Sequence, residues 1–230
     1  MTTLGELLKE VPTSVSSQKS TLRVERASRP DQEFSLSTRD EQIYALMHQL
    51  FFRHISGPVR SVGFTSIETG TDTARLCLEV AKTLVEEGRY DVGLIDASLG
   101  RVSLADQLEI PSPANPTAPW AVAQRLWLVP QECWRTDHGK QPVTHKNLEL
   151  LREYVSEFDF SILHCRPISW LTARIGQNCD GLVLVLTANK TRRLVAAQIK
   201  DQLSRAHVPL LGTVLADRRF PVPSGLYRSL

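Results

Sequence analysis

The stretch VGFTSIETGTDTARLCLEVAKTLVEEGRYDVGLIDA, residues 62 to 97, decides the fold because its hydrophobic pattern changes twice along its length. An apolar start at 62–64 leads into a loop, 65–73, that is rich in small, hydroxyl and acidic residues. A helix follows, since apolar residues recur at three- and four-residue steps and Gly88 stands where a helix commonly ends. A second apolar run at 92–95 completes the unit. Two strands joined by a crossover helix of this length pair in parallel, with a right-handed connection.

The rest of the chain continues this alternation of strands and helices. Further strands are predicted at 125–130, 160–163, 180–188 and 208–217, and further helices at 39–55, 104–108, 146–158, 169–176 and 191–206. A proline-rich stretch at 111–119 and a polar stretch at 132–144 are predicted to be loops. The fold class is therefore α/β, a doubly wound and mostly parallel sheet with helices on both faces. We expect one domain at 39–220 between a flexible N-terminal tail, 1–38, and a C-terminal tail, 221–230.

Two of the predicted helices have an apolar face that indicates which side is buried. For the helix at 39–55 the buried face consists of Ile43, Leu46, Met47, Leu50 and Phe51. For the helix at 191–206 it consists of Leu194, Ala197, Ile199 and Leu203. The N-terminal tail has a short apolar stripe of its own, LGELLKEV, which fits either a frayed helix in a disordered tail or a docking helix for a partner.

Composition excludes several classes of function. The net charge of +2 provides no broad basic surface for nucleic acid, and 42% apolar residues suffice for a buried core. No apolar run reaches the roughly 18 residues that a membrane span needs, and the start of the chain lacks the pattern of a signal peptide. The four cysteines share no CxxC spacing, so we expect reduced structural thiols in a cytoplasmic protein.

Five blocks in the predicted order resemble the bacterial tyrosine kinases of capsule and exopolysaccharide synthesis, the CpsD/CapB family of the MinD/ParA-like P-loop class. The blocks are EQIYALMHQL before the first strand, FTSIETGTDTAR at the phosphate-binding loop, VGLIDASLG at the second strand, FDFSILHCRP at the Walker B strand and DGLVLVLTANKTRR. The resemblance covers about residues 38 to 217. It implies a P-loop NTPase-like fold, with ATP and Mg²⁺ as the cofactors of an active member.

The loop block lacks the residues that such a kinase uses to hold phosphate. A phosphate-binding loop combines free backbone N–H groups, a lysine for the β- and γ-phosphates and a hydroxyl for Mg²⁺. By resemblance Gly70 keeps the first glycine, Asp72 takes the place of the second, Thr73 that of the lysine and Ala74 that of the hydroxyl residue. Glu68 adds another negative charge. We expect the Asp72 carboxylate to cap the following helix and to occupy the region that phosphate would fill.

The positions that bind metal in the family are also changed. Asp96 ends the second strand, but Ser98 replaces its acidic partner and His164 replaces the Walker B aspartate. The position of Asp96 at the end of a strand also indicates a structural role, in which its carboxylate caps the next turn. No catalytic residue and no metal ligand is therefore predicted. The nucleotide-binding residues that remain, as a vestige, are Gly70, Thr71, Asp72, Thr73, Ala74 and Asp96.

The leading hypothesis is a catalytically inactive relative of these kinases, without a cofactor, that serves polysaccharide synthesis and export as an accessory or regulatory protein. Its partner would be the cytoplasmic part of an inner-membrane chain-length or export protein, so it would be at most peripheral to the membrane. One alternative is a weakly active tyrosine kinase or ATPase that binds ATP and Mg²⁺, with Arg75 in place of the lysine. Another is a MinD/ParA-like positioning or secretion adaptor. The oligomeric state stays open, because Tyr44 and Met47 replace the arginines of the family's ring-forming helix.

Overall fold

The structure is a computed structural model that describes residues 38–53, 57–114, 116–135 and 142–216. The predicted C-terminal tail and nearly all of the predicted N-terminal tail lie outside these residues. Within the described part of the chain, no helix has the length and apolar character required to cross a membrane.

Seven strands form one sheet in the order β3-β4-β2-β5-β1-β6-β7. All neighbouring pairs are parallel except β3 and β4. The strands are β1 (Ser61–Ser66), β2 (Val92–Ala97), β3 (Trp120–Ala123), β4 (Leu126–Val129), β5 (Phe160–Cys165), β6 (Gly181–Thr187) and β7 (Leu210–Ala216). This arrangement confirms the predicted doubly wound, mostly parallel sheet.

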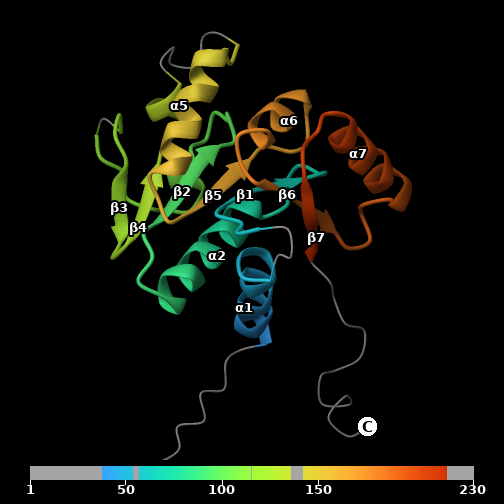
Figure 1. Cartoon of the computed structure of the whole chain (residues 1–230), viewed down its shortest axis with the longest axis horizontal. Coiled ribbons are helices and arrows are strands. Elements are labelled where there is room, and N and C mark those ends of the chain that lie inside the picture. The colour runs from blue at the N-terminus through green and yellow to red at the C-terminus, as the bar shows by residue number, and fades with distance from the viewer. Residues whose placement is uncertain (1–37, 54–56, 115, 136–141, 217–230) are drawn as a thin grey trace, which may run out of the picture. The chain divides into compact units, whose positions relative to one another are not determined.

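Helices cover both faces of the sheet (Figure 1). They are α1 (Thr38–Phe51), α2 (Thr73–Glu87), α3 (Leu104–Gln107), α4 (Gln131–Trp134), α5 (His145–Ser156), α6 (Trp170–Gly176) and α7 (Arg193–Arg205). In Figure 1, α1 and α2 lie together below the sheet, whereas α5 and α6 lie above it. The predicted face of α1 is confirmed, because Met47, Leu50 and Phe51 are buried.

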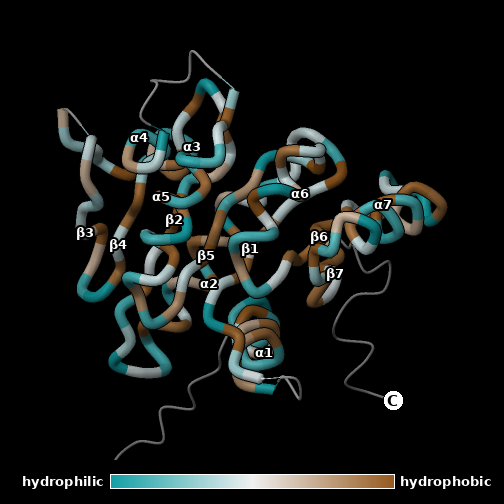
Figure 2. The backbone as a smooth tube through the Cα atoms, turned by 45° about the horizontal axis from the view of Figure 1, so that its top comes forward, coloured by the Kyte–Doolittle hydropathy of each residue, from teal (hydrophilic) through white to brown (hydrophobic). Residues whose placement is uncertain are grey.

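The core consists of two apolar clusters, one on each face of the sheet, and the hydropathy of the backbone shows the strands as the apolar centre (Figure 2). Successive residues of a strand point to opposite faces. In β5, for example, Ile162 belongs to the cluster beneath α1 and α2, whereas Leu163 belongs to the cluster beneath α5 and α6. Strands covered on both faces need apolar residues at every position, which explains the unbroken runs in the sequence.

Two elements were missed by the sequence analysis. The strand β3 follows the proline-rich stretch and pairs antiparallel with β4 at the edge of the sheet. The helix α4 lies at the start of the stretch predicted to be a polar loop and places Trp134, which is fully buried, in the core. Both elements have only four residues, so neither could show a clear hydrophobic period.

The predicted buried face of α7 is wrong in part. Ile199 and Leu203 are buried, but Ala197 is exposed and Leu194 is 78% exposed. Ile199 and Leu203 are four residues apart and share one face of the helix, whereas Leu194 lies five residues before Ile199 and therefore points elsewhere.

We predict that replacing the fully buried Leu84 of α2 with alanine destabilises the protein by about 2–5 kcal/mol, because it removes core contacts and leaves a cavity. The control is Leu194→Ala, which should change the free energy of unfolding by less than about 0.5 kcal/mol because Leu194 is exposed. Urea unfolding followed by circular dichroism measures both. Equal losses in the two variants would show that the side of α7 that bears Leu194 is packed.

Candidate functional site

A cavity of about 390 Å³ lies at the carboxyl ends of the central strands. Its lining comes from the segments that follow β1, β2 and β5. The chain leaves β1 for α2 on one face and leaves the adjacent β5 for α6 on the other, so this is a switch point, where open α/β sheets bind ligands. The lining residues are Ser66, Thr69, Gly70, Thr71, Thr73, Ser98, Gly100, Arg101, Val102, Gln107, His164, Cys165, Arg166 and Pro167.

Side chains of the loop after β1 bond to their surroundings. The Thr71 hydroxyl lies 3.0 Å from the hydroxyl of Thr187 at the end of β6. The Glu68 carboxylate accepts a hydrogen bond of 2.8 Å from the Thr191 hydroxyl, and the Ser66 hydroxyl donates to the Glu68 carbonyl. The first two contacts join the loop to the end of β6 and to the segment that follows it.

Asp72 caps α2, as the sequence predicted. Its carboxylate accepts a 3.2 Å hydrogen bond from the Arg75 backbone N–H. It does not, however, line the cavity, because it borders a separate groove between α1, α2 and β7. The expectation that this carboxylate fills the phosphate region stays a prediction, and its charge does act on His164 in the cavity lining. Arg75 does not reach the cavity lining either, since it pairs with Glu79 one turn along the helix.

Asp96 is 1% exposed and its carboxylate accepts three hydrogen bonds. The donors are the backbone N–H of Ser98 at 3.0 Å, the Ser98 hydroxyl at 2.7 Å and the backbone N–H of Leu104 at 2.8 Å. This confirms that Asp96 caps the turn after β2. Its oxygens thereby fix the start of α3.

His164 stands opposite Asp96 in the register of β5 and β2 and lines the cavity. The residue is 6% exposed, and its Nδ1 atom has no hydrogen-bond partner in the described part of the chain. Burial lowers the pKa of the imidazole, while the carboxylates of Asp96 and Asp72 act in the opposite direction. His164 is therefore neutral at pH 7, and a neutral imidazole cannot replace a carboxylate as a ligand of Mg²⁺.

The other predicted vestigial residues lie close together. Thr73 is 3% exposed and Ala74 is 5% exposed, both in the first turn of α2. Gly70 has a φ of 87°, a backbone conformation that glycine adopts readily. Gly70, Thr71 and Thr73 line the cavity, but Asp72, Ala74 and Asp96 do not.

Arg166 was missed as a site residue. It lines the cavity from the segment directly after β5, next to His164 and Cys165. Its position three residues after the end of the strand predicted at 160–163 was the available signal, because the carboxyl ends of parallel strands meet at one edge of a sheet.

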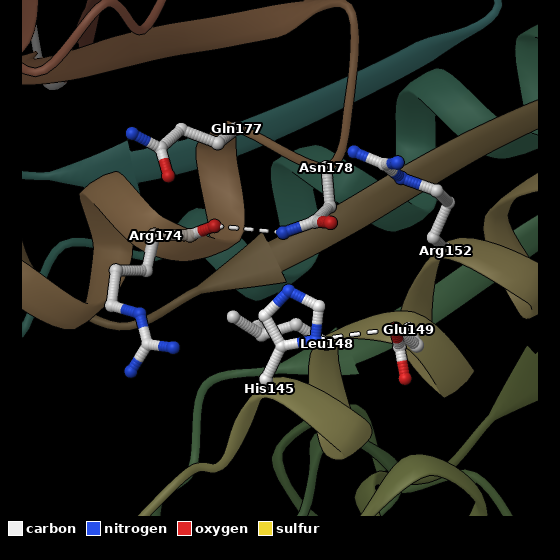
Figure 3. A pocket seen from close by; sticks show the side chains of 7 residues that line it. All are labelled: His145, Leu148, Glu149, Arg152, Arg174, Gln177 and Asn178. Atoms are coloured by element: carbon white, nitrogen blue, oxygen red, sulfur yellow. Dashed lines mark hydrogen bonds and ion pairs between the residues drawn. The ribbon is translucent and has the colours of Figure 1, made fainter.

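A second hollow, of about 250 Å³, lies between α5 and the end of α6 (Figure 3). Its lining includes Arg152, Arg174 and Asn178, and an Asn178 side-chain N–H donates to the Arg174 carbonyl. None of the residues predicted from the phosphate-binding motifs lines it. Among the residues the structure describes, no group of three or more His, Cys, Asp or Glu side chains is placed to hold a metal ion.

We predict that His164 makes the stability fall as the pH falls below about 6.5, the ordinary pKa of histidine. The unfolded state then binds a proton that the folded state resists, because the folded pKa is lowered. His164→Gln should remove this contribution, which reaches about 1.4 kcal/mol per pH unit. Urea unfolding from pH 7.5 to 5 measures it. His207→Gln, at an exposed position, is the control and should keep the wild-type slope. Equal slopes in wild type and His164→Gln would contradict the assignment.

No protein-family model matches this sequence, and a comparison with curated proteins finds no significant match. Solved structures do match. The kinase domain of VpsO has a TM-score of 0.62 at 17% identity, covering 79% of this chain and 97% of its own. The kinase domain of the Escherichia coli tyrosine kinase Etk has a TM-score of 0.60 at 14% identity, covering 81% of this chain and 80% of its own.

The septum site-determining protein MinD from Pyrococcus horikoshii, complexed with Mg-ADP, has a TM-score of 0.53 at 15% identity, covering 74% of this chain and 76% of its own. Identities at this level establish the fold and nothing finer. The chain has the fold of the bacterial tyrosine kinase domains and of MinD-type P-loop proteins.

Proposed function

We propose that this protein is a catalytically inactive relative of the exopolysaccharide and capsule tyrosine kinases, with an accessory or regulatory role in polysaccharide synthesis and export. The observation that carries the proposal is the set of hydrogen bonds that the Asp96 carboxylate accepts. Its carboxylate, which would hold the metal in an active member by resemblance, accepts three hydrogen bonds from Ser98 and Leu104. His164 is neutral beside it, and no carboxylate residue is among those that line the cavity, which supports the absence of a Mg²⁺ site.

The loop after β1 supports the same proposal. Among the described residues, none of those that line the cavity is a lysine, and Ala74 offers no hydroxyl to a metal ion. Phosphoryl transfer depends on positioning and on cations that neutralise the charge developing on the transferred group. A protein whose loop lacks the lysine and the metal ion can therefore keep the fold and lose phosphoryl transfer.

The proposed partner is the cytoplasmic part of an inner-membrane chain-length or export protein, which would place this chain at the inner face of the membrane. This partner follows from the resemblance of the five sequence blocks. The competing assignment is a positioning or secretion adaptor of the MinD/ParA type. The neighbouring genes would distinguish the two functions. Genes for glycosyltransferases and polysaccharide export favour the first, whereas flagellar or partition genes favour the second.

We predict that the wild-type chain releases no phosphate from ATP in the presence of Mg²⁺ and transfers none to a tyrosine peptide, because the cationic groups of the reaction are missing. The variant Thr73→Lys/Ala74→Ser restores the lysine and the hydroxyl and should bind ATP at least tenfold more tightly than wild type, which corresponds to about 1.4 kcal/mol. Isothermal titration calorimetry measures the affinity.

The matched control is Arg75→Lys/Ala74→Ser, which places the lysine two residues further along the helix and should leave the affinity unchanged. Turnover by the wild type that is lost in a folded Asp96→Asn variant would overturn the proposal. It would instead support the alternative of a weakly active enzyme.

A further inference from the structure

The sheet ends at β7, whose outer edge has no neighbouring strand among the residues that the structure describes. None of the seven residues of β7, LLGTVLA, is buried, whereas every residue of β1, β2 and β5 is buried. Leu215 is 51% exposed, although leucine is among the residues most often found inside proteins. The backbone N–H and C=O groups along such an edge can pair with a strand of another chain.

The two edges of the sheet differ in their protection against such pairing. Proteins commonly guard an edge strand by making it short, by interrupting it with a bulge, or by placing charged residues or proline in it. At one edge, β3 has only four residues, and its register with β4 shifts between Ala121 and Ala123. At the other edge, β7 has no charged residue and no proline, and the shift in its register with β6 lies before Gly212. Residues 212–216 therefore form a regular edge without charge.

There is open space beside this edge. The groove between α1, α2 and β7 has a volume of about 560 Å³, and its lining includes Val214, Leu215 and Ala216 of β7. These apolar residues are therefore not fully covered by the two helices. Gly212 is also open, because no described residue apart from its neighbours in the chain has an atom within 4 Å of the point where a Cβ atom would lie.

The sequence of β7 fits a second copy of itself in antiparallel orientation. With a two-fold axis through Thr213, this residue meets its own equivalent, and threonine pairs in opposed strands are favourable. Gly212 then lies opposite Val214, whose side chain would enter the open space at the glycine. Leu211 lies opposite Leu215, so that leucine meets leucine. No like charges oppose each other at any position of the pair.

We propose that two copies of this chain pair through the outer edges of β7, antiparallel about Thr213, so that the sheet of one copy continues into the other. The pairing gives the backbone groups of both edges hydrogen-bond partners and removes the exposed Leu215 from water. A second copy fits better than a different partner, because the two halves of the strand match each other and no charge in it would select an oppositely charged chain.

This interface goes beyond the proposed function and does not depend on it. No residue of β7 lines the cavity at the carboxyl ends of the central strands. The two chains can therefore pair whether or not the cavity holds a nucleotide, and ATP hydrolysis by the wild type would overturn the proposed function while leaving the interface unaffected.

Analytical ultracentrifugation of the full chain over a range of concentrations tests the pairing. The wild type should form a dimer in a concentration-dependent manner. Thr213→Lys places two ammonium groups opposite each other on the two-fold axis and should raise the dissociation constant of the dimer at least tenfold. Thr213→Glu should do the same with two carboxylates. An equimolar mixture of the two variants should restore the dimer, because lysine then lies opposite glutamate.

The matched control is Ser204→Lys, which adds the same charge at an exposed position of α7 and should form dimers as the wild type does. Circular dichroism verifies that the variants fold, which is expected because Thr213 is exposed. A wild type that stays monomeric, as it would if another protein or the terminal residues of the chain covered β7, would overturn the inference. Equal dimer formation by Thr213→Lys and the control, or a mixture of the charged variants that stays monomeric, would overturn it as well.

Discussion

The parallel pairing of β1, β5 and β2 in one register is the constraint on which the rest of the structure depends. Phe64, His164 and Asp96 occupy matching positions in the three strands. Because side chains alternate with a period of two, a slip of one residue would move each side chain of the strand from one core cluster to the other and disrupt the packing of both. The same register brings the three following segments to one edge of the sheet, and these segments form the cavity.

At that edge the protein satisfies buried polar groups by internal hydrogen bonds. Asp96 accepts from Ser98 and Leu104, and the Trp134 indole N–H donates to the Asp96 carbonyl at 3.0 Å. A buried carboxylate needs such donors, since burial without them costs several kcal/mol. Through these bonds Asp96 links the end of β2 to the start of α3.

The residues that line the cavity include no carboxylate, although the charges of Asp72 and Asp96 act on His164 in that lining. The acidic loop GTD and the neighbouring Glu68 indicate repulsion of phosphate, yet Asp72 and Glu68 face other partners. Arg101 and Arg166, which are 65 residues apart in the sequence, border the same cavity. The Asp72 cap is a local interaction, whereas the hydrogen bond between Thr191 and Glu68 joins residues 123 positions apart in the sequence. The order of the strands brings the segments that bear the two arginines to one edge of the sheet.

The sequence alone determined the alternation of strands and helices, the parallel sheet and the buried face of α1, because these depend on local periodicity. It also determined the capping roles of Asp72 and Asp96, because each cap joins residues within a few positions of one another. It did not determine β3 or α4, which are too short to have a period, or the direction of Leu194, which depends on how α7 packs. Only the tertiary structure decided which polar groups line the cavity. The side of a loop on which Asp72 or Arg166 lies depends on contacts with distant segments, and no pattern along the chain encodes those contacts directly.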